Sequence, residues 1–129
     1  FLASCPLAVS FALFEHHALQ PAAQAVYGQA VTRVDHLGSF ACRNVYNREN
    51  GRRSQHASAN ALDIAGFRLA DGQRINLLRD WKDSGDKGRF LRQVRDGACK
   101  NFNTVLGPDY NAAHQNHFHL DMGAWRVCR

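Results

Sequence analysis

ANALDIAGFRL, residues 59–69, is the segment that decides the fold class. It is rich in aliphatic residues, and the turn residues at 70–72 separate it from RINLL at 74–78, so we predict a β-hairpin. Side chains alternate between the two faces of a strand. The leucine and the isoleucine beside Asp63 therefore belong on the core face, and Asp63 belongs on the open face among small alanines.

The other predicted elements are two helices and two further strands. Apolar residues recur at helical spacing and predict an amphipathic helix over 10–19. Strands are predicted over 31–37 and, as the last element, over 117–122. Ser84 is predicted to cap a helix that runs to residue 98. Helices and strands without regular βαβ alternation indicate an α+β fold, in which helices flank a small, mainly antiparallel sheet.

Composition limits the class of protein without choosing a function. The chain has 129 residues, 45% hydrophobic and 21% charged, which is enough for one modest core, so residues 1–129 are assigned to a single domain. A net charge of +5 and a pI near 9.4 favour acidic partners. Nucleic acid, anionic lipid and peptidoglycan all meet that description.

Four cysteines indicate the compartment: Cys5, Cys42, Cys99 and Cys128. An even number without C-x-x-C pairs indicates two disulfides in a periplasmic or secreted protein, and the alternative is four reduced thiols in a cytosolic one. We favour Cys5–Cys42 and Cys99–Cys128, because each ties an end of the chain to its body. The apolar start of the sequence is too short to span a bilayer, so no membrane insertion is expected. Any targeting signal is expected outside this sequence.

Three of the seven histidines, His114, His117 and His119, lie within six positions near the end of the sequence. On a strand, His117, His119 and Asp121 share one face, while a phenylalanine and a leucine occupy the other. The apolar pair suits a core. The histidine face should therefore open onto a cavity.

A second group of polar residues lies around the first predicted strand. His56 and Asp63 are seven positions apart, an odd separation that excludes a shared face on one straight strand, so His56 is expected in a loop that bends back. With His119 they supply three ligands that suit zinc (Zn²⁺) and leave a fourth position for water. Zinc would polarise a carbonyl and lower the pKa of that water to about 7.

Catalysis at such a site needs a base and a cation. His117 is the expected base, because it lies one strand repeat from the last ligand, and Asp121 is expected to orient an imidazole. Arg43 is the preferred cation for a developing oxyanion, with Arg52 and Arg53 as competitors. Each residue alone also fits a plainer role, as a structural histidine, a turn aspartate or a solvated loop charge.

Together the motifs resemble known families. Ser54-x-His56, then Asp63, then His117-x-His119 resembles the motif of the zinc peptidases that include lysostaphin, the D-Ala-D-Ala carboxypeptidases and the hedgehog amino-terminal domain. Over nearly the whole chain, segments such as GSFACRN, SQHASANALDIAGFRLADG and HFHLD resemble the bacterial extensin-like C-terminal domain family. The resemblance implies an α+β fold with a small antiparallel sheet. It also implies the ligands His56, Asp63 and His119, with His117 as the catalytic histidine.

The resemblance extends to further residues and also shows departures. It implies that Arg43 binds the substrate or the oxyanion and that Ser54 fixes the substrate backbone. The H-x-x-H-x-H spacing resembles that of penicillin-insensitive murein endopeptidases and implies a second active-site histidine at His114. The carboxypeptidases usually carry a glutamate base before the last ligand, whereas AAHQNHFH has none. Ala59 or Asn60 stands where their motif has glycine.

The expected function is zinc-dependent hydrolysis of peptide bonds in peptidoglycan stem peptides or cross-links. A D,D-endopeptidase cutting D-Ala–diaminopimelate and a D,D-carboxypeptidase both fit, and the departures favour the endopeptidase. The alternative is a non-catalytic, zinc-containing wall-binding or interaction domain.

A nucleic-acid binder or nuclease is disfavoured because no recognition helix or aromatic platform is visible, so no nucleic-acid partner is expected. A cupin would need a further glutamate and histidine. We expect a monomer that acts on peptidoglycan, with an inhibitor or immunity protein if it serves as a toxin.

Overall fold

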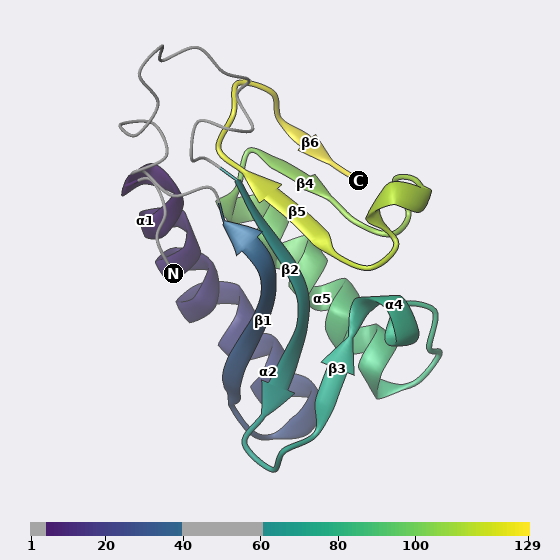
Figure 1. Ribbon diagram of the computed structural model, residues 1–129. Coiled ribbons are helices and arrows are strands. Elements are labelled where there is room, and N and C mark those ends of the chain that lie inside the picture. Colours follow the sequence, from purple (N-terminus) through teal and green to yellow (C-terminus); the bar gives the residue numbers. More distant parts are fainter. Residues whose placement is uncertain (1–4, 40–60) are drawn as a thin grey trace.

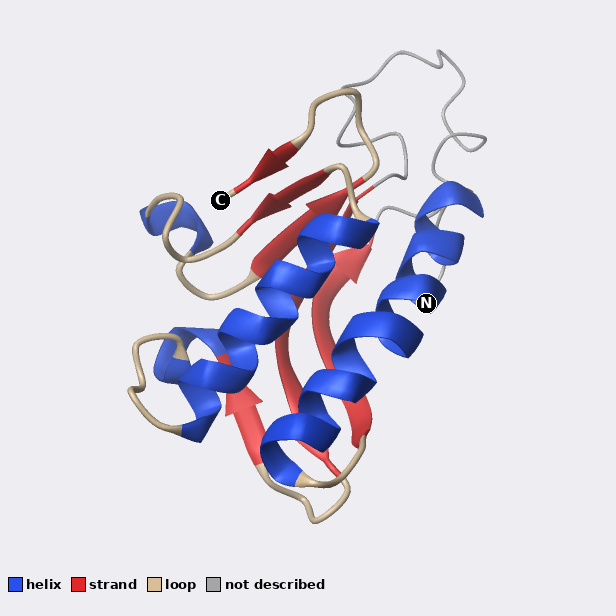
Figure 2. Ribbon diagram, turned by 180° about the vertical axis from the view of Figure 1, so that it is seen from behind, coloured by secondary structure: helices blue, strands red, loops and turns tan. Residues whose placement is uncertain are grey.

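The computed structural model describes residues 5–39 and 61–129, in which a layer of helices covers one face of a mixed but mostly antiparallel sheet. Figure 1 views the sheet from its open side, and Figure 2, from behind, shows the helices in front of the strands. The predicted α+β class with helices flanking the sheet is confirmed. Within the described residues, no helix combines the length and the apolar character needed to cross a membrane.

The first helical segment runs without a break through residues 5–27. It consists of α1 (Cys5–Phe14), a π-helical segment η1 (Glu15–Leu19) and α2 (Gln20–Tyr27). The helix predicted over 10–19 is therefore too short at both ends. Pro21 does not stop it, because the π-helical turn already departs from the hydrogen-bond pattern that a proline would interrupt. The helix ends where Gly28 takes a left-handed φ of 67° and donates to Gln24 O at 2.9 Å.

The sheet has the strand order β1-β2-β5-β4-β6, and β3 also pairs with β2. Its members are β1 (Val31–Ser39), β2 (Ala61–Leu69), β3 (Arg74–Asn76), β4 (Thr104–Leu106), β5 (Phe118–Asp121) and β6 (Val127–Cys128). All described pairs are antiparallel except β4–β6. The sequence predicted β5 as the last strand, and this is wrong because β6 follows it. The two residues of β6 are too few for an alternating pattern to reveal them.

The predicted hairpin is confirmed, but its second strand is shorter than predicted. Of the predicted partner at 74–78, only β3 (Arg74–Asn76) pairs with β2, and the two leucines that follow begin α4 (Leu77–Asp80). Asn76 caps this helix, because its side chain accepts a hydrogen bond from the backbone N–H of Arg79 at 3.0 Å. Its own N–H donates to Asp80 Oδ2 at 2.8 Å. This local capping outweighs the continuation of the strand.

The long helix α5 (Asp86–Asn101) packs along the first helical segment and the back of the sheet (Figure 2). Ser84 does not cap it. Gly85 occupies the cap position, and the carboxylate of Asp83 accepts from the Gly85 N–H at 3.0 Å. Its buried side consists of Phe90, Leu91, Val94 and Ala98.

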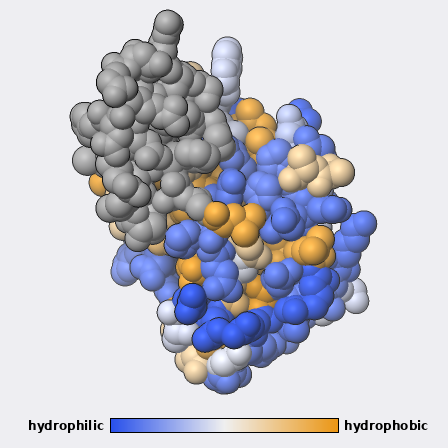
Figure 3. Space-filling view, viewed as in Figure 1, coloured by the Kyte–Doolittle hydropathy of each residue, from blue (hydrophilic) through white to orange (hydrophobic). Residues whose placement is uncertain are grey.

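The core lies between the helices and the sheet. Edge-to-face ring pairs join its layers, with centroids 5.6 Å apart for Phe14–Phe102 and 5.5 Å for Phe67–Phe90. On β2 and β5 the core-facing side chains near the end of the sheet that carries Asp63 and His119, all at most 1% exposed, are Leu62, Ile64, Phe118 and Leu120. The residues that alternate with them must therefore face the open side of the sheet. Figure 3 shows that side, where hydrophobic patches lie among hydrophilic residues.

The predicted disulfide Cys99–Cys128 is present and joins α5 to β6. It closes a loop with a sequence separation of 29. Removing it by a Cys99→Ala/Cys128→Ala double substitution is expected to lower the free energy of unfolding by about 3–4 kcal/mol, because the unfolded chain regains loop entropy. Urea unfolding followed by circular dichroism measures this change. Wild type and variant should converge once both are reduced. Equal midpoints under oxidising conditions would contradict the prediction.

Candidate functional site

β2 and β5 bring the two predicted halves of the site together. In their antiparallel register Asp63 lies directly opposite His119, and Ala61 lies directly opposite Asp121. Residues directly opposite each other share a face of the sheet. Their faces are the open ones, because the residues between them are buried on the helix side. The alternation predicted from the sequence therefore places these side chains correctly.

His119 lies between two carboxylates. Its Nδ1 is 3.0 Å from Asp63 Oδ1, and its Nε2 is 2.8 Å from Asp121 Oδ2. The histidine is only 8% exposed. Asp121 is itself held in place, because its Oδ1 accepts the backbone N–H of Gly123 at 2.8 Å. Both ring nitrogens of His119 thus have fixed partners.

The electrostatics of this group favour positive charge between the carboxylates. Burial opposes the charged imidazolium, but the hydrogen bonds to Asp121 and Asp63 outweigh it and raise the pKa of His119 to about 9. Burial likewise opposes the ionised form of Asp121, but the hydrogen bonds from His119 and Gly123 lower its pKa below the ordinary value. The two carboxylates therefore stabilise a cation between them, which here is the imidazolium form of His119.

Two more histidines border this group. His117 Nε2 is 3.9 Å from Asp63 Oδ1, beyond hydrogen-bond distance, and its Nδ1 is 2.7 Å from Asn116 Oδ1. The ring of His114 lies 5.0 Å from that of His117 and 6.2 Å from that of His119. Burial, followed by the charges of His117 and His119, lowers the pKa of His114. His114 therefore favours its neutral form.

Asp63 Oδ1 and His119 Nδ1 are placed as two ligands of a zinc site would be. Two ligands of a tetrahedral zinc, each about 2.0–2.1 Å from the ion, lie roughly 3.3 Å apart. Asp63 Oδ1 and His119 Nδ1 are 3.0 Å apart, so a shift of a few tenths of an ångström would let them share one ion. Within residues 5–39 and 61–129 no three histidine, cysteine, aspartate or glutamate side chains form a metal-binding group. A complete site needs a further ligand, and His56 is the one predicted.

The family comparison covers the entire sequence. The model of the family described as "Extensin-like protein C-terminus" matches residues 1–129. The chain belongs to this extensin-like C-terminal family. No match was found among curated proteins or among solved structures. The family resemblance predicted from the sequence is therefore confirmed, and the wider zinc-peptidase superfamily stays a prediction for the extensin-like domain.

Several predicted residues of the extensin-like domain lie outside the described part of the chain. They are Cys42, Arg43, Arg52, Arg53, Ser54 and His56. The Cys5–Cys42 pairing falls there as well. The structure thus brings together Asp63, His114, His117, His119 and Asp121, and the predicted roles of Arg43, Ser54 and His56 stay predictions.

Residues that were not predicted from the sequence support the histidines. Tyr110 packs edge-on against His114 at 5.3 Å, and Asn111 Oδ1 lies 2.7 Å from His114 Nδ1. They come from the β4–β5 connection, which Trp81 anchors by donating from Nε1 to Asp109 Oδ1 at 2.9 Å. One signal in the sequence could have revealed the Asn111–His114 contact. The two residues are three positions apart, and residues at that spacing meet within a helical turn.

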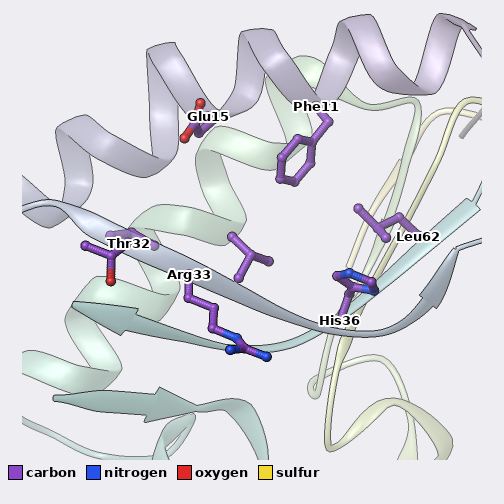
Figure 4. A pocket seen from close by; sticks show the side chains of 8 residues that line it. Phe11, Glu15, Thr32, Arg33, His36 and Leu62 are labelled. Carbon is purple, nitrogen blue, oxygen red and sulfur yellow. The ribbon is translucent and has the colours of Figure 1, made fainter. Parts of the chain in front are cut away.

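A separate cavity of about 270 Å³ lies on the helix side of the sheet, between the first helical segment and β1 (Figure 4). Phe11 and Glu15 line it from the helices, and Thr32, Arg33 and His36 line it from β1. Its lining includes none of the described site residues. In the extensin-like domain this cavity is therefore distinct from the histidine cluster.

Proposed function

We propose that this extensin-like domain is a zinc-dependent peptidoglycan peptidase of the lysostaphin, D-Ala-D-Ala carboxypeptidase and hedgehog superfamily. It hydrolyses stem peptides or cross-links, as a D,D-endopeptidase at D-Ala–diaminopimelate or as a D,D-carboxypeptidase. The observation that carries the proposal is the 3.0 Å approach of Asp63 to His119, with His117 beside them. The Cys99–Cys128 disulfide supports a periplasmic or secreted location.

Asp63 and His119, with His56, would hold the zinc ion. When bound, zinc supplies a Lewis acid for the scissile carbonyl and acidifies a water molecule. Asp121 acts through His119, because its carboxylate fixes the orientation of the imidazole. This positioning keeps the ligand atom aimed toward Asp63.

His117 is placed to move the proton. Its Nδ1 faces the acceptor Asn116 Oδ1 at 2.7 Å, which suits the tautomer with its hydrogen on Nδ1 and a lone pair on Nε2. Nε2 is the atom that faces Asp63. His117 can therefore accept a proton from a water molecule held at the site and return it to the leaving amine.

Mass spectrometry of muropeptides tests the function directly. Purified sacculi incubated with zinc-loaded protein should show cross-linked dimers converted to monomers, each cut adding one water. Loss of terminal D-alanine would identify a carboxypeptidase instead. His119→Ala protein and chelator-treated wild type serve as controls and should leave the pattern unchanged. Intact muropeptides after incubation with zinc-loaded wild type would contradict the proposal, and binding without cleavage would favour a wall-binding domain.

A further inference from the structure

The open face of the sheet continues beyond the histidines toward the C-terminal strands. Leu106 of β4 lies directly opposite His119, and Thr104 lies directly opposite Asp121. Val127 of β6 pairs with Thr104. Directly opposite residues share a face. The side chains of these three strands therefore form one surface that begins at the proposed site.

A cavity of about 410 Å³ occupies this surface. Two aromatic residues border it: Tyr110 from the connection before β5, 44% exposed, and Trp125 from the connection after β5, 77% exposed. Leu106 and Val127 form part of its floor. A mostly apolar hollow of this size with a few polar groups is typical of ligand pockets.

The cavity is joined to the proposed site by two residues. Asp121 lines the cavity and also binds His119. Tyr110 lines it and packs against His114 at 5.3 Å. Its outer wall is fixed, because Thr104 Oγ1 donates to Trp125 O at 2.7 Å and the disulfide holds β6. A substrate bound at the histidines would therefore extend into a formed pocket.

Charge and distance indicate which part of a substrate fits. The described lining includes the carboxylate of Asp121 and neither lysine nor arginine, so an acidic group would be repelled and left unpaired. Neighbouring strands are about 4.8 Å apart, which puts β4 and β6 roughly 5–10 Å from β5. An extended peptide covers about 3.3–3.6 Å per residue. A cationic group is not favoured either, because the Asp121 carboxylate already pairs with His119 Nε2 at 2.8 Å and accepts from the Gly123 N–H at 2.8 Å. The occupant is therefore an uncharged group one to three residues from a bond held at β5.

We propose that this cavity is a substrate subsite for an uncharged aliphatic residue, such as alanine, of the stem peptide. The residue lies within three positions of the scissile bond and packs against Trp125 and Tyr110. The inference rests on the proposed function, which places the scissile bond beside His119. A sugar ring of the glycan strand is the competing occupant, and the experiment separates the two.

Binding is tested first, without catalysis, on metal-free protein. Trp125 is 77% exposed and Trp81 only 6%, so a ligand in the cavity should shift the emission of Trp125 to shorter wavelength. The probes are N-acetyl-D-alanyl-D-alanine amide, its counterpart with D-glutamate in place of one alanine, and the disaccharide of the glycan strand. We expect a saturable shift with the alanine probe alone, which Trp125→Phe removes. No shift, or a shift with the disaccharide alone, would overturn the inference.

Kinetics on cross-linked muropeptides provide the second test. Trp125→Ala should raise KM about tenfold with kcat changed less than about twofold, as expected from losing roughly 55 Å² of apolar contact. Leu78→Ala is the matched control, because Leu78 is 61% exposed on α4 and outside this cavity. If wild type cleaves and Trp125→Ala has the same KM, the subsite is wrong and the proposed function stands. If wild type does not cleave, the proposed function fails, and the fluorescence titration alone decides the subsite.

Discussion

The Asp63→Asn variant is expected to lose its zinc and nearly all activity. The amide keeps the shape of the carboxylate but removes the negative charge that faces His119 at 3.0 Å. Asp63 is the one carboxylate in the proposed ligand set of His56, Asp63 and His119. Two neutral imidazoles and an amide hold a divalent cation poorly. Bound zinc should fall from about one ion per chain to nearly none, and hydrolysis should fall by at least about 10³-fold. Elemental analysis after dialysis and the rate of muropeptide release measure the two effects.

The matched control for this variant is Asp96→Asn. Asp96 lies on α5, its side chain is 67% exposed, and it pairs with Arg95 at 2.8 Å. An exposed pair of this kind contributes little to stability, so metal content and rate should equal those of wild type. Full zinc occupancy in Asp63→Asn protein that unfolds like wild type would remove Asp63 from the ligand set.

The second large effect is expected from His117→Ala, which should keep zinc and lose catalysis. His117 Nε2 is 3.9 Å from Asp63 Oδ1, near enough to reach a water molecule at the site without being a ligand in the predicted set. Loss of a general base typically lowers the rate by about 10²–10⁴-fold. The decrease should be in kcat, measured on cross-linked muropeptides, while metal content stays unchanged.

His16→Ala is the corresponding control, because His16 is an exposed histidine on η1, in the helical layer. It should leave both kcat and zinc content unchanged. If His117→Ala protein loses its zinc, His117 is a ligand and not the base. If the variant keeps a wild-type kcat, another group takes the proton.

Strand alternation was sufficient to choose the faces of the site residues. Apolar residues on both sides of Asp63 and of His119 require burial, so the polar residues between them had to face the open side. Alternation could not reveal that β2 and β5 are neighbours in the sheet. Asp63 and His119 are 56 positions apart, and their register depends on the whole sheet. The motif resemblance supplied the pairing that periodicity lacks.

Local capping and short elements account for the parts that were wrong. Asn76 ends the predicted second strand and starts a helix through one side-chain hydrogen bond, and Gly85, whose N–H donates to the Asp83 carboxylate, takes the cap position predicted for Ser84. The connection that carries Tyr110 is held by individual contacts, among them the hydrogen bond from Trp81 Nε1 to Asp109 Oδ1 and that from the Tyr110 N–H to Gly107 O. Such features depend on individual contacts, and a hydrophobic pattern does not contain them.

The strand order also determines when the residues of the candidate site can come together during synthesis. β5 lies in the middle of the sheet, between β2 and β4, although it comes from near the end of the sequence. A chain that has not yet added residues 118–129 contains Asp63 but not His119. A nascent chain that stops before residue 118 therefore lacks half of the candidate site. Under the proposed function, cleavage activity would arise only after residues 118–121 have been synthesised and have paired with β2 and β4.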